Sequence, residues 1–243
     1  MDYLKKMIDS LSVVFPAYNE NQRLKDCFYD IEKFNQTTSI KKIEYIFVDD
    51  GSTDFTSNKI RKFIKDKDDN NYKLIKLNNN IGKGGALSKG VIYTKYNWVL
   101  TLDTDISVSL LEIEKWNKNN YIKNKNIYFG SRNLKKSKLK FKLHRKLIGF
   151  LFILICRLLF NIKIHDTQCG FKLYEKKIAK KIFHRMKEKR FAHDIEIVLL
   201  AKLYKVKIVE LPVTWIHKSD SKLDLVKDSL DMFVSLLKIK KRY

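Results

Sequence analysis

Two acidic residues, Asp103 and Asp105, follow an apolar segment and are separated only by Thr104. In an extended segment, residues two apart point to the same side of the chain. Two carboxylates on one side of a tight turn suit a hard divalent cation such as Mg²⁺ or Mn²⁺, and such a cation would neutralise a diphosphate leaving group. Taken alone, however, a solvated acidic turn is the commoner explanation for such a pair.

A glycine-rich turn precedes this pair in the chain. It covers residues 81–86, with the sequence IGKGGA, and opens a predicted helix. Glycines allow the backbone to approach a ligand closely, and a helix N-terminus favours anions. The turn lacks the Lys-Ser or Lys-Thr of a Walker A loop, and Leu87 stands at the last glycine position of the dinucleotide fingerprint. Phosphate binding and a simple strand-to-helix turn are both compatible with it.

A second acidic segment begins with Asp49 and Asp50, at the end of another apolar run, and continues as GSTD over residues 51–54. Ser52 or Thr53 would be a suitable N-cap for a helix predicted over residues 53–65. Two adjacent carboxylates at the end of a buried strand also need partners, which a ribose or a base edge would supply. A purely structural cap and a ligand contact both fit the segment.

The elements that position these segments are predicted from apolar periodicity. Strands are predicted over residues 11–15, 43–48, 72–77, 98–102, 126–130 and 207–211, with Pro16 ending the first. Helices are predicted over residues 22–34, 53–65, 86–94, 147–160 and 223–243. The alternation indicates an α/β fold with a mostly parallel central sheet flanked by helices. Ligands of such sheets bind beyond the carboxyl ends of the strands, where the polar segments should meet.

The order of the motifs resembles that of family 2 glycosyltransferases. The matching segments are 12–20 (SVVFPAYNE), 48–54 (VDDGSTD), 82–86 (GKGGA) and the acidic pair. The second half is similar to the dolichyl-phosphate β-glucosyltransferase branch, a group of polyprenyl-phosphate hexosyltransferases, through residues 166–174 (DTQCGFKLY), 191–196 (FAHDIE) and 213–215 (VTW). The resemblance covers nearly the whole chain. It implies the GT-A fold, with a Rossmann-like sheet and amphipathic, membrane-associated helices in the second half.

The resemblance also implies which residues form the site. The nucleotide sugar would be bound by Pro16, Tyr18, Glu20, Asp49, Asp50, Lys83, Gly84, Asp103 and Thr104. The divalent metal, Mg²⁺ or Mn²⁺, would be held by Asp103 and Asp105. The phosphate of the acceptor would meet Arg132, Arg145, Gln168 and Lys172. The residues expected at the reacting centre are Asp194, Asp105 and Arg132.

Three of these positions carry a second interpretation or a departure from the family pattern. Asp194 is also a suitable N-cap for a helix over residues 195–204. His217 stands where some GT-A enzymes place an extra metal ligand, although lone histidines are seldom ligands. The dolichol branch usually has aromatic residues at positions 191 and 193, so we expect His193 to alter sugar or acceptor preference.

The predicted reaction is inverting transfer of a hexose, with UDP-glucose as the donor, onto a polyprenyl phosphate of the dolichyl type. A phosphate monoester is already a dianion for much of the time near neutral pH, so it needs positioning more than deprotonation. Transfer onto a glycan or a cell-wall polymer is an alternative, as is the use of another donor such as GDP-mannose or UDP-GlcNAc.

The formal charge of +23 would attract polyanions, including nucleic acid and anionic lipid headgroups. Nucleic-acid binding is disfavoured, because the acidic residues cluster at strand ends and no recognised binding motif is present. A basic cluster at Lys138, Lys140, Lys142, Arg145 and Lys146 precedes the apolar residues 147–160. This pattern predicts an interfacial helix, with a buried core helix as the alternative.

The 243 residues suit a single domain, with residues 1–133 binding the nucleotide sugar and residues 134–243 facing the acceptor and the membrane. The spacing of the three cysteines matches no disulfide framework or zinc site, which indicates a reducing compartment. No run reaches the roughly 18 apolar residues of a spanning helix, and residues 1–10 lack a signal-peptide pattern. We therefore expect a cytoplasmic protein bound peripherally to a membrane; the sequence does not indicate its oligomeric state.

Overall fold

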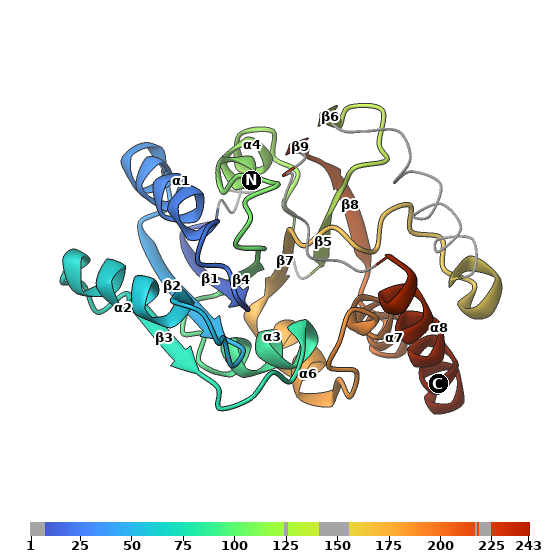
Figure 1. Ribbon diagram of the computed structural model, residues 1–243. Coiled ribbons are helices and arrows are strands. Elements are labelled where there is room, and N and C mark those ends of the chain that lie inside the picture. The colour runs from blue at the N-terminus through green and yellow to red at the C-terminus, as the bar shows by residue number, and fades with distance from the viewer. Residues whose placement is uncertain (1–7, 124–125, 141–155, 217, 219–224) are drawn as a thin grey trace.

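The computed structural model describes residues 8–123, 126–140, 156–216, 218 and 225–243 (Figure 1). The strands are β1 (Ser10–Ala17), β2 (Lys42–Asp49), β3 (Tyr72–Lys76), β4 (Trp98–Thr101), β5 (Ile127–Ser131), β6 (Lys138–Lys140), β7 (Lys172–Glu175), β8 (Ile208–Pro212) and β9 (Thr214–Ile216). The helices are α1 (Leu24–Thr37), α2 (Thr56–Lys67), α3 (Lys83–Ile92), α4 (Leu111–Lys118), α6 (Lys176–Arg185), α7 (His193–Leu203) and α8 (Leu225–Arg242). Residues 156–160 are also helical.

Within the described residues, the main sheet has seven strands in the order β3-β2-β1-β4-β7-β5-β8, and β6 pairs with β9 in a separate small sheet. All pairings in the main sheet are parallel except those of β7, which runs antiparallel to β4 and β5. The prediction of a mostly parallel sheet flanked by helices is confirmed. The carboxyl ends of β1 to β5 therefore lie at one edge, together with the beginning of β7.

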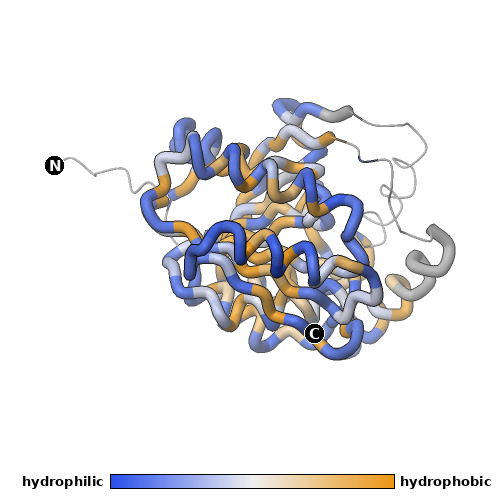
Figure 2. Tube along the Cα trace, turned by 60° about the vertical axis from the view of Figure 1, so that its left-hand side comes forward, coloured by the Kyte–Doolittle hydropathy of each residue, from blue (hydrophilic) through white to orange (hydrophobic). Residues whose placement is uncertain are grey.

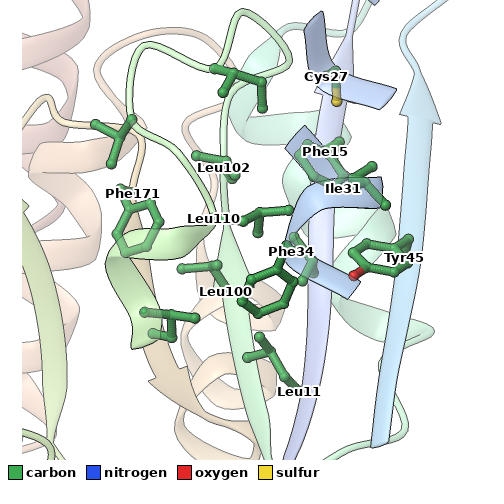
Figure 3. Close-up of a cluster of buried hydrophobic side chains, with 14 of the residues drawn as sticks. Leu11, Phe15, Cys27, Ile31, Phe34, Tyr45, Leu100, Leu102, Leu110 and Phe171 are labelled. Atoms are coloured by element: carbon green, nitrogen blue, oxygen red, sulfur yellow. The ribbon is translucent and has the colours of Figure 1, made fainter. Parts of the chain in front are cut away.

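Each central strand contributes to two apolar cores, because alternate residues face opposite sides of the sheet. Val13 and Phe15 of β1 belong to a cluster with residues of α1, α2 and α4, including Phe34 (Figure 3). Val14 and Val48 belong to the other cluster, with residues of α3, α6, α7 and α8. Figure 1 shows these helices as layers on either side of the sheet, and Figure 2 shows the apolar segments running through the interior. A sheet covered on both faces requires such nearly continuous apolar strands.

The prediction that Pro16 ends the first strand is wrong. β1 continues through Pro16 to Ala17 and stays in register with β2. β4, however, pairs with β1 only as far as Val14, whose carbonyl accepts a hydrogen bond from the backbone N–H of Leu102. Alternate residues bond to opposite neighbours, so Pro16 faces the side on which β4 has already ended. Its missing N–H therefore costs no hydrogen bond of the ladder.

The prediction that Ser52 or Thr53 caps the second helix is also wrong. α2 begins at Thr56, and its N-terminal neighbour Phe55 makes no capping hydrogen bond through its side chain. Ser52 Oγ instead accepts from the backbone N–H of Asn19 at 2.9 Å, and the N–H of Thr53 donates to Asn19 Oδ1 at 2.8 Å. The segment therefore joins the loops that follow β1 and β2, at the edge where ligands are expected.

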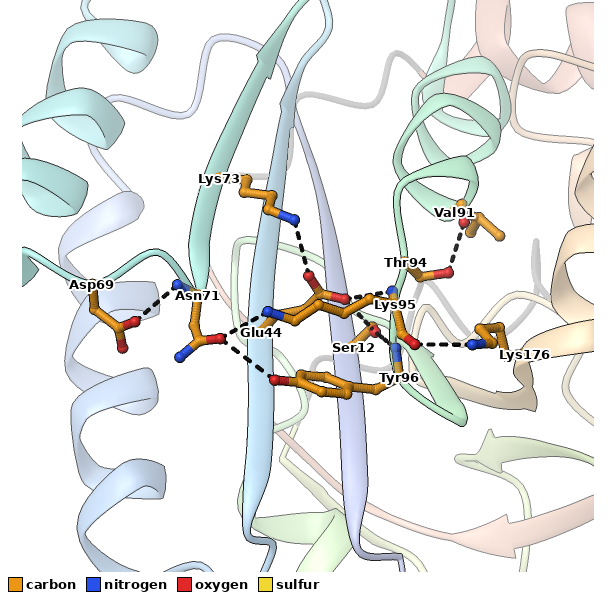
Figure 4. A network of polar contacts seen from close by, with 10 residues as sticks. All are labelled: Ser12, Glu44, Asp69, Asn71, Lys73, Val91, Thr94, Lys95, Tyr96 and Lys176. Atoms are coloured by element: carbon orange, nitrogen blue, oxygen red, sulfur yellow. Dashed lines mark hydrogen bonds and ion pairs between the residues drawn. The ribbon is translucent and has the colours of Figure 1, made fainter.

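A buried carboxylate secures the sheet near the beginnings of its strands. Glu44 of β2 is fully buried, and its Oε1 accepts from Ser12 Oγ and from the backbone N–H of Lys95, each at 2.7 Å (Figure 4). Its Oε2 lies 3.4 Å from Nζ of Lys73. These contacts join β1, β2, β3 and the segment before β4, so this acidic residue has a structural role away from the predicted site.

Some elements of the structure were not predicted from the sequence, and parts of the second half lie outside the described residues. β7 was not predicted as a strand, and no element was predicted where α4 lies. Arg145, Lys142, His217 and most of the helix predicted over residues 147–160 lie outside the described residues. None of the helices in the described ranges combines the length and the apolar composition needed to cross a membrane.

Candidate functional site

A pocket at the edge of the sheet collects residues from four separate segments. Its polar lining includes Lys83 at the start of α3, Asp103 after β4, Lys172 at the start of β7 and Asp194 in the first turn of α7. The strand-end argument predicted that the segments of Lys83 and Asp103 would meet, and the family resemblance assigned Lys172 and Asp194 to the same site. Four of the predicted site residues therefore share one pocket.

Asp103 lies on the wall of this pocket and contacts both a cation and a glycine. Its Oδ1 lies 2.6 Å from Nζ of Lys83. A Cβ atom added at Gly170 would lie 2.3 Å from Asp103 Oδ2, which is far closer than van der Waals contact allows. Gly170 therefore lets the chain before β7 approach the carboxylate of Asp103 directly.

Asp105 carries an electrostatic cost that a cation would relieve. Burial raises the pKa of Asp105, and the charge of Asp103 raises it further, while the backbone N–H of Ser107 and the charge of Lys83 offset part of the rise. The N–H of Ser107 donates to Asp105 Oδ1 at 2.8 Å. Thr104, between the two acids, is buried. Two neighbouring carboxylates with too little compensating charge are suited to a divalent cation.

The donor set fits a cation that is shared with a substrate. Within the described ranges, no group of three or more His, Cys, Asp or Glu side chains is arranged to hold a metal ion. Mg²⁺ is commonly held by one or two carboxylates, with substrate phosphates and water completing its coordination. The oxygens of Asp103 and Asp105 match that pattern.

The glycine-rich turn is held in place by Asp50. Its Oδ1 accepts from the backbone N–H of Ile81 and its Oδ2 from that of Gly82, both at 2.8 Å. Burial raises the pKa of Asp50, and these two N–H donors lower it in part. Gly82 has a φ of 94°, a backbone conformation that residues with a side chain rarely adopt. The turn that carries Lys83 therefore depends on a carboxylate from the end of β2.

Asp49, at the end of β2, is fully buried beside Asp50 and is hydrogen-bonded to the following loop and to α2. Its Oδ1 accepts from the backbone N–H of Ser52 at 2.9 Å, and its Oδ2 is hydrogen-bonded to Ser57 Oγ. These bonds orient the start of α2 next to the ligand edge. The structure thus gives Asp49 a definite local role besides the predicted contact with a nucleotide.

Pro16, Tyr18 and Glu20 lie along the end of β1 and the loop that follows it. The side chain of Tyr18 is 42 % exposed. Glu20 pairs with Arg23 at 2.5 Å, and its backbone N–H donates to Thr56 Oγ1 at 2.7 Å. An exposed aromatic ring next to an anchored loop offers a surface on which a nucleotide base could stack.

Asp194 is a carboxylate held between the side chains of Lys172 and His193. Its Oδ1 lies 2.5 Å from Nζ of Lys172 and 3.1 Å from Nε2 of His193. Burial alone would raise the pKa of Asp194, but the charges of His193 and Lys172 outweigh burial and hold the pKa well below its ordinary range. The interpretation of Asp194 as an N-cap is wrong, because α7 starts at His193 and its cap position is Ala192. Asp194 is therefore a persistent anion and a weak proton acceptor.

Arg132 forms a two-point ion pair with Asp166. Its Nε and Nη2 lie 2.7 and 2.9 Å from the two carboxylate oxygens, and its backbone N–H also donates to Asp166 Oδ2. Burial would raise the pKa of Asp166, but Arg132 lowers it overall. The backbone N–H of Gln168 donates to Asp166 Oδ1 at 3.2 Å. Arg132 and Gln168 therefore share one anchor, and 31 % of the Arg132 side chain is exposed.

Sequence reasoning named no role for Gly170 or Asp166. A side chain at Gly170 would collide with Asp103, which lies against this residue. Asp166 has its role through the ion pair that it forms with Arg132. The signal for both was their place in the segment DTQCGFK, which was matched as a motif without a separate role for each residue. Arg145 and His217 lie outside the described residues, so their predicted roles stay predictions.

Solved structures with the same architecture are glycosyltransferases of the GT-A fold. Glucosyl-3-phosphoglycerate synthase from Mycobacterium tuberculosis, in complex with Mn²⁺, UDP and phosphoglyceric acid, superposes with a TM-score of 0.71 at 16 % identity, covering 96 % of this chain and 78 % of that one. The UDP complex of the same enzyme gives a TM-score of 0.66 at 15 % identity, over 96 % and 80 % of the two chains. The GT-A fold predicted from the motifs is confirmed.

The sequence comparisons give the family. The model of glycosyl transferase family 2 matches residues 12–183. Dolichyl-phosphate beta-glucosyltransferase of Dictyostelium discoideum is 34 % identical, over 98 % of this chain and 77 % of that protein. The human protein of that name is 32 % identical, over 96 % and 75 % of the two chains. The chain belongs to glycosyl transferase family 2 and is a glycosyltransferase.

Proposed function

We propose that this glycosyltransferase transfers a hexose from a nucleotide sugar, UDP-glucose, to a polyprenyl phosphate of the dolichyl type, with inversion at the anomeric carbon. The proposal is supported by relatives named dolichyl-phosphate beta-glucosyltransferase that are matched over nearly the whole chain. It is also supported by solved neighbours that bind UDP and UDP-glucose.

The observation that carries the proposal is the environment of Asp194. An acceptor hydroxyl would require a general base near the reacting centre. Asp194 is instead paired with Lys172 and His193 on the same oxygen, which makes it a weak base. A phosphate acceptor is already a nucleophile near neutral pH and needs orientation rather than deprotonation. The pocket therefore fits a phosphate better than the hydroxyl of a glycan or a cell-wall polymer.

The donor would lie along the edge formed by β1, β2 and α3. Its base and ribose would be bound by Pro16, Tyr18, Glu20 and Asp49, and Asp50 would act through the turn that it holds. Lys83, Gly84 and Thr104 would lie next to the diphosphate, near Asp103. Residues 1–133 would thus form the donor part of the domain, and residues 134–243 the acceptor part.

A divalent cation, Mg²⁺ or Mn²⁺, would be held by Asp103 and Asp105, and it would stabilise the negative charge of the departing diphosphate. Lys83 contributes a positive charge on the same side of the pocket. On the acceptor side, Arg132, Arg145, Gln168 and Lys172 would position the phosphate. Asp194 would orient the acceptor or stabilise positive charge that develops on the sugar.

A transfer assay tests the proposal. The protein is incubated with Mg²⁺ or Mn²⁺, a short polyprenyl phosphate and radiolabelled UDP- and GDP-sugars, and the lipid is then extracted into organic solvent. Label should enter the lipid from UDP-glucose, and none should enter the matching polyprenol, which lacks the phosphate. Labelling of the polyprenol, or of a soluble glycan instead of the lipid, would contradict the proposal.

We further propose that the protein binds peripherally to the cytoplasmic face of a membrane. From Met232 onward, where side chains are described, α8 buries Leu236 and Ile239 against the domain. Its other side leaves apolar residues 43–48 % exposed, at Phe233, Val234 and Leu237. Exposed cations follow at Lys238, Lys240 and Lys241. An apolar face beside cationic residues suits an anionic bilayer surface.

Vesicle sedimentation tests the membrane proposal. The protein should sediment with vesicles that contain phosphatidylserine and much less with vesicles of phosphatidylcholine alone. The double change Phe233→Ser and Leu237→Ser should weaken sedimentation, whereas Leu203→Ser, at an exposed apolar residue of α7, should not. Equal sedimentation of all three proteins would reject α8 as the contact.

A further inference from the structure

Glu196 lies in the first turn of α7 and is fully buried, although the proposed reaction gives it no role. Its Oε2 accepts from two consecutive backbone N–H groups, that of Lys187 at 3.0 Å and that of Glu188. Both donors belong to the loop over residues 186–192, which joins α6 to α7. Because buried donors need a partner, this carboxylate fixes the beginning of the loop.

The other oxygen of Glu196 is held by two residues at the end of α8 and just after it. Tyr243 donates its hydroxyl to Oε1 at 3.0 Å, and Nη1 of Arg242 lies 3.7 Å from the same atom. Burial and the charge of Glu196 raise the pKa of Tyr243 to about 12, so near neutral pH the hydroxyl keeps the proton that it donates. Each oxygen thus has its own donors, and the carboxylate is fixed in orientation.

The loop that Glu196 holds packs directly against the glycine-rich turn. The backbone N–H of Gly85 donates to the carbonyl oxygen of Lys189 at 2.9 Å. A Cβ atom added at Gly82 would lie 2.5 Å from the same carbonyl oxygen, and one added at Gly84 would lie 2.8 Å from the carbonyl oxygen of residue 188. The two backbones lie too close for a side chain to fit between them, so a shift of the loop must move the turn.

The glycine-rich turn is therefore held from two directions. Asp50 accepts from the two N–H groups at its beginning, and the loop accepts from the N–H of Gly85 near its end. Lys83 lies between these bonds in the chain, and its Nζ is 2.6 Å from Asp103 Oδ1. The place of this ammonium group beside Asp103 depends on both contacts of the turn.

We propose that Glu196 is a positioning residue for the donor part of the site, which acts through the loop over residues 186–192 to set the place of the glycine-rich turn and of Lys83. The kinetic consequence rests on the proposed function, in which Lys83 would lie next to the diphosphate of the donor. Without Glu196, the N–H groups of Lys187 and Glu188 lose their buried acceptor, and the loop must move to satisfy them. The turn then loses one of its two contacts, and the diphosphate should bind less tightly.

Amide hydrogen exchange measures the contact between loop and turn without any substrate. The N–H of Gly85 lies in the first turn of α3, where a helix supplies no acceptor of its own, so its protection depends on the loop. The chain has eight glycines, and ¹⁵N-glycine labelling therefore gives a simple spectrum, with Gly85 and Gly90 assigned from their absence in the alanine variants.

In Glu196→Leu, exchange at Gly85 should become about tenfold faster, while exchange at Gly90, which lies later in the same helix, should change much less. An equal acceleration at both glycines would indicate a general loss of stability and would overturn the proposal. Unchanged exchange at Gly85 would overturn it as well, whatever reaction the protein catalyses.

Titration calorimetry with UDP and Mn²⁺ tests the consequence for the donor. The Kd of UDP should rise by about tenfold in Glu196→Leu, and the KM for the nucleotide sugar should rise with it, while the KM for the polyprenyl phosphate changes much less. Glu196→Gln keeps an oxygen that accepts from the two N–H groups of the loop, so it should restore most of the affinity. Wild-type affinity in Glu196→Leu, or an equal loss in Glu196→Gln, would overturn the positioning role.

Glu44→Leu is the matched control, because Glu44 is equally buried and hydrogen-bonded but joins strands away from the pocket. It should lower the melting temperature without raising the Kd of UDP, and an equal rise in both leucine variants would overturn the proposal. If Glu196→Leu does not fold, Glu196→Asp, whose oxygens are withdrawn by one methylene, should show the same changes in milder form. If no donor supports transfer at all, the proposed function fails, while the exchange experiment still decides the role of Glu196.

Discussion

Two pairs of aspartates lie at the same edge of the sheet, and they differ in how their charge is compensated. The β4 pair, Asp103 and Asp105, has one cationic contact within the described residues, from Lys83. The cation-bound pair consists of Asp166, held by Arg132, and Asp194, held by Lys172 and His193. Folding accordingly raises the pKa of Asp105 and lowers the pKa of both Asp166 and Asp194.

The difference indicates what each pair can still bind. An acid whose ionised form is disfavoured by burial and by a neighbouring acid gains free energy when a cation arrives. An acid already paired with buried cations gains little, and it serves as a fixed negative charge that orients its partners. The β4 pair is therefore suited to a metal and a diphosphate. The cation-bound pair is suited to holding Arg132 and Lys172 in place for an acceptor phosphate.

The largest expected effect comes from removing one charge of the β4 pair. Asp105→Asn should lower kcat/KM by about 1000-fold, because the developing charge on the diphosphate loses its cation. Because folding raises the pKa of Asp105, the negative charge of this residue costs the folded state free energy relative to the unfolded state. The melting temperature in EDTA should therefore be unchanged or higher.

Metal-dependent kinetics and thermal melting check this prediction together. The matched control is Asp66→Asn, which changes an exposed aspartate on α2 and should affect neither measurement. If Asp105→Asn kept full metal-dependent activity, the β4 pair would not be the metal site. If it were inactive but also strongly destabilised, the contrast between the two pairs would be wrong.

The cation-bound pair should show the opposite behaviour, with a large effect on stability. Asp166→Asn leaves the partly buried Arg132 without its carboxylate partner. Breaking such a pair lowers the free energy of unfolding by about 3 kcal/mol, which corresponds to a fall of roughly 10 °C in Tm. The control is Asp26→Asn, because the pair of Asp26 with Lys218 is exposed and is worth less than about 1 kcal/mol. Urea unfolding of the two variants measures the difference, and equal losses would show that Asp166 is no more than a surface partner.

Much of the fold could be predicted because its signals are local. Apolar strand runs followed by polar segments indicated the parallel strands and the edge at which they end. β7 was missed because a polar segment that contains Gly170 leads into it and because it is only four residues long. The place of Pro16 was missed for another reason: its strand can continue only because β4 ends early beside it. That depends on a neighbour far away in the sequence.

The gathering of candidate residues at one edge of the sheet was predictable, but the contacts between them were not. The motifs brought Lys83, Asp103, Lys172 and Asp194 to one edge, where the structure also places them. Pattern alone could not show that Lys172 contacts Asp194, because that contact depends on how β7 and α7 pack. The same holds for Asp50, which looked like a ligand residue and is bonded to the glycine-rich turn.

The pH dependence of stability provides a smaller test of the comparison. Folding lowers the pKa of Asp166 and of Asp194. Their contribution to the stability of the fold is therefore complete above the pKa of an unfolded aspartate, near 4, and is lost as the pH falls through the lower pKa values of the folded state. The Tm of the wild type should therefore fall steeply below about pH 4. In Asp166→Asn the fall should be shallower, because one of the two acids is gone. Parallel curves for the two proteins would show that Asp166 is not linked to folding in this way.

The smallest effect should come from a single methyl group next to the β4 pair. In Gly170→Ala the new Cβ would overlap Asp103 Oδ2, so the carboxylate must turn away from its present position beside Lys83. The Mn²⁺ concentration for half-maximal activity should rise by about tenfold, and saturating Mn²⁺ should restore most of the rate. Gly90→Ala is the matched control, because its Cβ would overlap Val14 and Val48 in the core. Gly90→Ala should lower Tm without changing the Mn²⁺ requirement. If the requirement rose in both variants, a general loss of packing in the fold, rather than the placement of Asp103, would set the metal affinity.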